Sequence, residues 1–340
     1  MNIRKALILL SVIFSFQIAQ SNDTVNLLMW WDKPLSLYLE KEVKTRCQVD
    51  LAYQGYVASD QFLYDFQIED WDIIVFESTI LDLVKDKLLE KNINIKNNLM
   101  KEYPLFIRNQ LNKQLGSSER DYNNLTFFSI NNIVIVYDPK KISISDDTDI
   151  KSIINQLADT GKELVLLDDP NIINAILKVE GYNKMSLSSF ETLFDYKNII
   201  IQNYINGYEN VGVMITWSSF ALQYIIDAKD RGFEFELFEI PKYRFTTSTY
   251  IVQLRSNKSV NCVMNFMTSK DFMSKSSNLV FDFTPYANYE VVKNKRFYQL
   301  YKNFYKLGSK NDLKWVYQFS DLEESLYDSW GQILTMKKGV

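Results

Sequence analysis

Acidic, hydroxyl and tryptophan side chains recur in this sequence directly after apolar stretches of strand length. Such side chains suit a cationic ligand, because carboxylates neutralise ammonium groups and tryptophan can hold a cation over its ring face. Asp and Ser after a strand also cap helices, and tryptophan is also a core residue, so each one alone has a structural explanation. Together they predict a binding site, and the groups are Trp31 and Asp32, Glu77 to Thr79, Asp168 and Asp169, and Thr216 to Ser219.

The stretch from Asn26 to Thr79 must position the first two of these groups. Apolar runs of strand length alternate here with a helical pattern, which is typical of βαβ units and a parallel sheet. Ligands of open parallel sheets bind beyond the carboxyl ends of the strands. We expect strands at 26–31, 49–52 and 72–76, and a helix at 34–46.

The rest of the chain repeats this alternation around two long β-branched and aromatic runs, at 125–137 and 244–254. We interpret these runs as strands that cross between two lobes. Further strands are expected at 164–167, 212–215 and 235–240, and helices at 150–158, 172–180, 189–194, 196–206, 220–229, 260–267, 296–306 and 322–336.

This order of elements predicts an α/β fold with two lobes, each a mixed sheet flanked by helices, joined by hinge-crossing strands. A length of 340 residues is enough for two domains. Lobe 1 is expected to comprise residues 24–129 and 247–287, and lobe 2 residues 130–246 and 288–340.

Composition excludes several classes of function. The chain has no histidine, which rules out Ser-His-Asp and Cys-His mechanisms and removes the commonest transition-metal ligand. A formal charge of −4 argues against a nucleic-acid binder, and the 10 glycines form no glycine-rich phosphate loop. We therefore expect no catalytic residues, no metal and no cofactor.

The first 21 residues are expected to be a cleavable signal peptide. Arg4 and Lys5 precede an apolar segment at 6–16, and Ala19-Gln20-Ser21 is a small-x-small cleavage site. Export permits a disulfide between Cys47 and Cys262, but sequence alone cannot place two cysteines together, and two free buried thiols are the favoured expectation.

An ordered series of segments resembles the bacterial periplasmic solute-binding proteins of the spermidine/putrescine type, which belong to the type 2 class of two-lobe binding proteins. The likeness runs in order along nearly the whole mature chain, although no single motif is diagnostic. The segments are LLMWWDKPLSLYLEKEV, WDIIVFEST, IVIVYDPKKI, LVLLDDP, VGVMITWSSFA and FTPYANYEVV.

The resemblance also implies individual ligand contacts. Trp31 and Trp217 take the positions of two cleft tryptophans, and Asp169 takes that of an amine-binding aspartate. Glu77 to Thr79, Phe283, and Tyr317 or Gln318 fall near further contact positions of the family. The full set of expected ligand-binding residues is Trp31, Asp32, Glu77, Ser78, Thr79, Asp169, Trp217, Ser248, Phe283, Tyr317 and Gln318.

The chain departs from the family at two carboxylates. Ile172 stands where the family has a glutamate, and Thr246-Thr247-Ser248 stands where it has Trp-x-Asp. An unpaired charge in a desolvated site costs several kcal/mol, so losing two counter-charges disfavours spermidine as the ligand. A small amine or another compact polar solute remains the expected ligand.

The resemblance implies a periplasmic, monomeric solute-binding subunit of an ABC importer. It would close on a small amine-like or polyamine-like solute by hinge motion and then dock on a membrane permease. Two alternatives stay open. The fold could serve a non-transport ligand or partner, or the chain could be an exported enzyme that uses Asp168 and Asp169 as acid and base.

Overall fold

The structure of the 340-residue chain is a computed structural model. It describes residues 23–30, 32–57, 61–62, 67–81, 84, 93, 95, 99–115, 124–202, 207–287, 290–308, 310, 312–316 and 324–338. The expected signal peptide and three expected ligand contacts, Trp31, Tyr317 and Gln318, lie outside the described residues.

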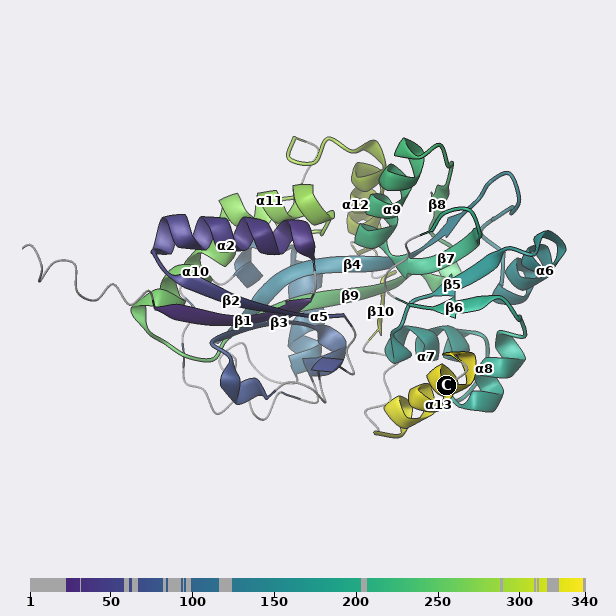
Figure 1. Ribbon diagram of the computed structural model, residues 1–340, viewed down its shortest axis with the longest axis horizontal. Coiled ribbons are helices and arrows are strands. Elements are labelled where there is room, and N and C mark those ends of the chain that lie inside the picture. Colours follow the sequence, from purple (N-terminus) through teal and green to yellow (C-terminus); the bar gives the residue numbers. More distant parts are fainter. Residues whose placement is uncertain are drawn as a thin grey trace, which may run out of the picture.

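One continuous mixed sheet runs through the described part of the molecule (Figure 1). Its strands follow the order β2-β1-β3-β9-β4-β7-β5-β6, with β10 beside β9 and β8 beside β4. The strands are β1 (Thr24–Trp30), β2 (Asp50–Tyr56), β3 (Ile73–Glu77), β4 (Leu125–Tyr137), β5 (Glu163–Leu166), β6 (Ile199–Ile201), β7 (Val211–Trp217), β8 (Glu236–Phe238), β9 (Phe245–Gln253) and β10 (Lys314–Trp315).

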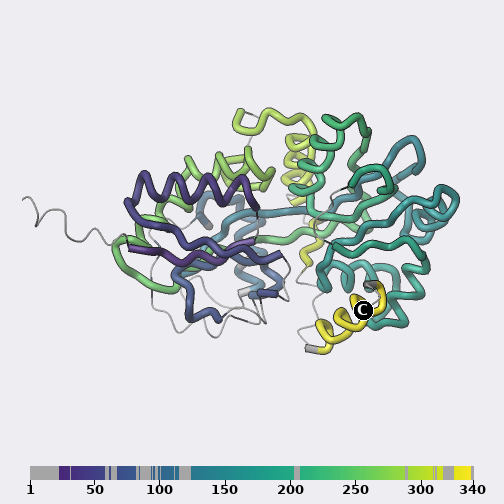
Figure 2. Tube along the Cα trace, in the orientation of Figure 1, coloured from purple at the N-terminus to yellow at the C-terminus, as the bar shows by residue number. Residues whose placement is uncertain are grey.

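Two parallel groups of strands lie at the ends of this sheet. Strand β1 pairs in parallel with β2 and β3, and β5 pairs in parallel with β6 and β7. We call β2, β1 and β3 the first sheet region, and β7, β5 and β6 the second. The long strands β9 and β4 join them through antiparallel pairs, and their traces pass between the two regions in Figure 2.

Helices cover both regions of the sheet (Figure 1). Helices α2, α10 and α11 pack together beside the first sheet region, whereas α7, α8 and α13 pack together beside the second. The helices are α2 (Lys33–Cys47), α5 (Leu105–Leu115), α6 (Ile150–Thr160), α7 (Pro170–Val179), α8 (Leu187–Leu193), α9 (Ser218–Asp230), α10 (Lys258–Met267), α11 (Lys270–Val280), α12 (Lys295–Gly308) and α13 (Glu324–Lys338), with 3-10 turns η1 (Ile68–Asp70), η2 (Leu99–Glu102) and η3 (Pro241–Tyr243).

Strand alternation divides the apolar interior into two cores. Along β4, Val134 and Val136 face the core that α9 also enters, whereas Ile133 and Ile135 face the core built with α6, α7, α8 and α13. Successive side chains of a strand point to opposite faces, which explains why a nearly all-apolar run suits a strand covered on both sides. The α/β architecture is thus confirmed, and the lobe boundaries at 129/130, 246/247 and 287/288 stay a prediction.

Residues 199–201 and helix α11 are two places where the structure differs from the sequence-based expectation. The helix expected at 196–206 is wrong at its centre, because residues 199–201 form β6 alongside β5. These residues are Ile-Ile-Ile, and β-branched side chains pack better on a sheet than on a helix. Helix α11 was not expected, because its sequence is rich in Ser, Lys and Asn, but Phe272, Met273 and Val280 form a buried stripe along it.

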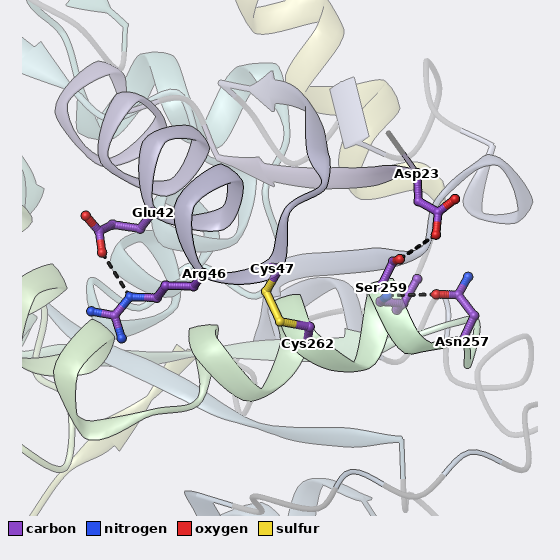
Figure 3. The surroundings of a disulfide bond; sticks show 8 residues. Asp23, Glu42, Arg46, Cys47, Asn257, Ser259 and Cys262 are labelled. Atoms are coloured by element: carbon purple, nitrogen blue, oxygen red, sulfur yellow. Dashed lines mark hydrogen bonds and ion pairs between the residues drawn. A yellow bond between two sulfur atoms is a disulfide. The ribbon is translucent and has the colours of Figure 1, made fainter. Parts of the chain in front are cut away.

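The expectation of two free thiols is also wrong, because Cys47 and Cys262 form a disulfide with an S–S distance of 2.02 Å (Figure 3). The bond joins the end of α2 to the middle of α10, and the two Cα atoms are 5.8 Å apart. Helix α10 has another contact with the start of the described chain, where the Ser259 hydroxyl donates a 2.7 Å hydrogen bond to Asp23 ahead of β1. The cysteines are 215 positions apart, so only the return of the chain to helix α2 beside the first sheet region brings them together.

No helix in the described part of the chain has both the length and the apolar character that crossing a bilayer requires.

Candidate ligand-binding site

Asp32 and Asp169 each begin a helix and each follow a parallel strand. The Asp32 carboxylate accepts a 2.8 Å hydrogen bond from the Leu35 amide at the start of α2. The Asp169 carboxylate accepts 2.8 and 3.3 Å hydrogen bonds from the first amides of α7. Asp169 is only 4% exposed. The capping interpretation therefore holds for both residues, and it also fixes their carboxylates at the strand ends where ligands of such sheets bind.

Glu77 is the last residue of β3 and belongs to the first sheet region. The residue is half-buried, but its Oε2 atom is shielded from solvent and makes no hydrogen bond. Burial, with the Asp169 and Asp282 carboxylates nearby, holds the pKa of Glu77 well above its ordinary value. Asp169 follows a strand of the second sheet region, so the structure brings together two expected site residues from opposite ends of the sheet.

Asp282 is a site residue that the sequence analysis missed. It follows α11 and is 3% exposed. Backbone hydrogen bonds of 3.0 and 3.1 Å between Ile130 and Phe283 hold this segment against β4. The Asn131 amide donates a 2.8 Å hydrogen bond to Asp282 Oδ1, whereas Asp282 Oδ2 has no partner at hydrogen-bonding geometry. Its signal in the sequence is an acid between two phenylalanines ahead of a Thr-Pro turn, and it does not follow a strand as the expected acids do.

Burial raises the pKa of each carboxyl in this group. Burial raises the pKa of Asp282 to about 7 despite the hydrogen bond from Asn131, and the Asp32 carboxylate adds to this effect. Burial also raises the pKa of Asp169 to about 6, against the opposing effect of its helix-capping hydrogen bonds, and it raises the pKa of Asp32. We call Asp32, Glu77, Asp169 and Asp282 the carboxylate cluster.

No ion pair to the carboxylate cluster occurs among the described residues. By contrast, the buried Glu239 has its own cation, Arg244, at 3.7 Å. Ionised carboxylates repel one another more strongly where the effective dielectric constant is lower than that of water. A group of buried carboxylates without a counter-charge is therefore costly when empty and suited to a cationic ligand.

Hydroxyl groups line the same strand ends. Ser78 and Thr79 follow β3 and are buried, and the Ser248 amide on β9 donates a 3.4 Å hydrogen bond to the Ser78 hydroxyl. The hydroxyls of Thr79 and Ser248 are buried without a hydrogen-bond partner in the structure. Buried hydroxyls nearly always find a partner, so these two are available to a bound polar solute.

The aromatic residues of the expected site lie in different surroundings. Trp217 ends β7, is half-buried and packs against the core of the second sheet region. Phe283 is 1% exposed and packs against Phe297, Tyr301 and Phe304. Phe283 is therefore a core residue in this structure, and its expected ligand contact stays a prediction, as do those of all the other residues named for the site.

Asp168 faces a different element from Asp169. Its carboxylate accepts a 2.8 Å hydrogen bond from the Trp330 indole on α13, whereas Asp169 caps α7. An acid–base pair needs two carboxyls that reach one substrate. The adjacent aspartates accept hydrogen bonds from two different helices, α13 and α7, which weakens the enzyme alternative. Among the described residues, no cluster of three or more carboxylates or cysteines has an arrangement that could hold a metal ion.

Comparisons with known proteins identify the fold. No protein-family model matches the sequence, and no curated protein matches it. The solved structures similar to this chain include the spermidine/putrescine ABC transporter substrate-binding protein PotD of Streptococcus pneumoniae, with a TM-score of 0.65 and 14% identity over 94% of this chain and 99% of that one.

Two other solved structures with a similar fold belong to a lipoprotein and to a receptor. The TpPotD lipoprotein of Treponema pallidum has a TM-score of 0.68 and 12% identity over 92% of this chain and 99% of that one. The GacH receptor of Streptomyces glaucescens, solved also in complex with acarbose, has a TM-score of 0.65 and 12% identity over 94% of each chain. The chain therefore has the two-lobe fold of type 2 periplasmic binding proteins, and the fold alone leaves its solute open.

Proposed function

We propose that this chain is the extracytoplasmic solute-binding subunit of an ABC importer and that it captures a small amine-like cation between its two lobes. The carboxylate cluster is the observation that carries the proposal. Its four acids come from both ends of the sheet, and burial raises the pKa of each of them above its ordinary value. None of them has a cationic partner among the described residues.

Capture then follows from electrostatics and hinge motion. A cation placed among these carboxylates supplies the counter-charge that the protein does not provide, and it contacts residues of both sheet regions at once. Such a ligand binds the closed arrangement of the lobes better than the open one and shifts the population toward it. No covalent step is involved, and the closed form would be the one that a membrane permease recognises.

The fold and the sequence pattern support the remaining parts of this proposal. Structures with the same fold include ABC transporter substrate-binding proteins. The charged and apolar pattern of residues 1–21 is that of a signal peptide, which would deliver the chain to the periplasm. We expect the mature protein to act as a monomer beside its permease.

A thermal-shift screen tests the cation proposal. Putrescine and shorter amines should raise the melting temperature, whereas glucose and glutamate should not. A ligand at about 100 times its dissociation constant stabilises the folded state by about 2.7 kcal/mol, which such a screen detects readily. A shift with glucose or glutamate and a flat response to every amine would show that the solute is not a cation.

Matched variants connect the response to the site. Glu77→Gln keeps the size of the side chain and removes its charge, and it should weaken amine binding at least tenfold. Glu191→Gln makes the same change at an exposed position on α8 and should leave binding unchanged. Equal affinity of the two variants for amines would exclude Glu77 from the site.

A further inference from the structure

Two carboxylate oxygens in the cluster have no hydrogen-bond partner although both are shielded from solvent. They are Glu77 Oε2 on β3 and Asp282 Oδ2 after α11. The Ser129 hydroxyl lies near enough to Asp282 to favour its ionised form, yet it makes no hydrogen bond of good geometry to it. A buried carboxylate oxygen without a donor is unstable as an anion, so each of these atoms is suited to receive either a proton or a cation.

Among the described residues, each titratable group that faces these two carboxyls is itself an acid. Asp169 at the start of α7 faces Glu77, and Asp32 before α2 faces Asp282. Within the part of the chain that the structure describes, neither lysine nor arginine contributes to the electrostatics of either carboxyl. The facing groups in the described part of the chain are Asp32, Asp169, the Tyr56 hydroxyl of β2 beside Glu77, and the Tyr103 hydroxyl beside Asp282. Asp168 and Tyr53 lie one step further out, beside Asp169 and Asp32 respectively.

We propose that the empty carboxylate cluster holds protons, and that a cationic solute displaces them when it binds, so that capture exchanges protons for a cation. The proposal rests on the proposed function for the identity of the solute. Protons leave to the solvent and no covalent bond to the protein forms or breaks. Burial, with repulsion from Asp32, already holds the pKa of Asp282 at about 7, and burial, with repulsion from Asp168, holds that of Asp169 at about 6. Both directions agree with protonation of the empty site near neutral pH.

Protons are then competing ligands of the site. If one proton is released for each solute bound, the apparent affinity falls about tenfold for each pH unit below the pKa of the group that releases it. Solute capture would weaken in acid and strengthen at neutral to alkaline pH. Asp282 and Glu77 would set this dependence, because their unpartnered oxygens are the ones that a solute cation can approach.

The empty protein should show the same protons in its stability. The folded pKa of these acids lies above the unfolded value of about 4, so the folded state binds more protons than the unfolded state between about pH 4 and pH 7. Stability therefore falls as the pH rises through this range. The melting temperature of the empty wild type should be lower at pH 8 than at pH 5.

Isothermal titration calorimetry with putrescine at pH 6.5 counts the protons directly. The observed heat, measured in two buffers with different ionisation enthalpies, gives the number of protons released per solute bound. We expect about one proton for the wild type and for Glu191→Gln, and less than half of one for Asp282→Asn. If Asp282→Asn does not fold, Glu77→Gln serves as the second variant, with the same expectation.

The two proposals fail in different ways. Putrescine binding without release of protons, together with a melting temperature that does not fall from pH 5 to pH 8, would overturn the exchange and leave the amine proposal standing. If the melting temperature falls from pH 5 to pH 8 in the wild type but stays constant in Asp282→Asn, the proton site is supported even if no amine binds. A fall that Asp282→Asn and Glu77→Gln both leave unchanged would overturn the assignment of the protons to this cluster.

Discussion

Removing the disulfide should cost this protein a large part of its stability. Cys47 and Cys262 close a loop of 215 residues, and closing a loop restricts the unfolded chain more than the folded one. Loop entropy for this length corresponds to about 5 kcal/mol at 25 °C. The double variant Cys47→Ser with Cys262→Ser should lose stability on this scale, since no other covalent link joins α2 to α10 in the described part of the chain.

The expected change in melting temperature follows from the size of the chain. Unfolding entropy averages about 2.1 cal/mol/K per residue, which for a chain of this length gives about 0.7 kcal/mol/K. A loss of about 5 kcal/mol then lowers the melting temperature by about 7 °C. Noncovalent contacts of α10, such as that between Ser259 and Asp23, remain in the variant and preserve the fold below this temperature.

Differential scanning calorimetry with and without dithiothreitol provides the measurement and its control. The reductant should lower the melting temperature of the wild type to that of the double variant, and it should not change the variant. A mass increase from alkylation that requires prior reduction would confirm that both thiols are paired. The reasoning is refuted if wild type and double variant melt within 1 °C of each other, or if the unreduced wild type takes up two alkyl groups.

Three further predictions concern packing, anchoring and capping. Gly212→Ala should destabilise the protein by about 1–3 kcal/mol in urea unfolding, because the added Cβ would lie 2.4 Å from Leu157 Cδ2 and 2.7 Å from Lys162 Cβ. The control is Gly331→Ala, which should be nearly neutral because no atom lies within 4 Å of the added Cβ. Trp330→Phe keeps the packing of α13 but removes one hydrogen-bond donor to Asp168, so the free energy of unfolding should fall by about 1–3 kcal/mol. Limited proteolysis should then release the segment after residue 323 faster than in the wild type, and an equal or slower release would contradict this prediction. Asp149→Ala should cost about 1 kcal/mol of stability at pH 7, because the carboxylate caps α6 and hydrogen bonds from the helix lower its pKa. A lowered folded pKa gives stability that is present above the unfolded pKa and lost as the pH falls through the folded pKa. The free energies of unfolding of wild type and variant should therefore become equal below about pH 3.

Local patterns in the sequence predicted most of the elements. The long strand at 125–137 matches β4 residue for residue, and the Asp-Lys-Pro and Asp-Pro pairs mark the starts of α2 and α7. These features follow from neighbouring residues alone, since strand alternation, helix caps and the fixed φ of proline act over a few positions. Where local signals conflicted, as at 199–201, pairing with β5 decided the outcome.

The candidate site was predictable only in part. Glu77 and Asp169 were recognisable from the sequence because each follows a buried strand, and parallel strands direct such residues to one edge of a sheet. Asp282 follows a helix instead, and no periodicity marks it. Its place beside Asn131 depends on a backbone bridge between Phe283 and Ile130, which are 153 positions apart in the chain.

The sequence by itself determined the alternation of strands and helices, the export signal pattern and the absence of histidine chemistry. Tertiary structure alone decided that acids from distant segments lie near one another, that they lack a counter-charge among the described residues, and that Cys47 pairs with Cys262. The physical reason is the distance along the chain over which each interaction acts. Helix capping and side-chain alternation depend on residues a few positions apart, whereas desolvation, charge repulsion and sulfur–sulfur contact depend on which remote segments the folded chain brings together.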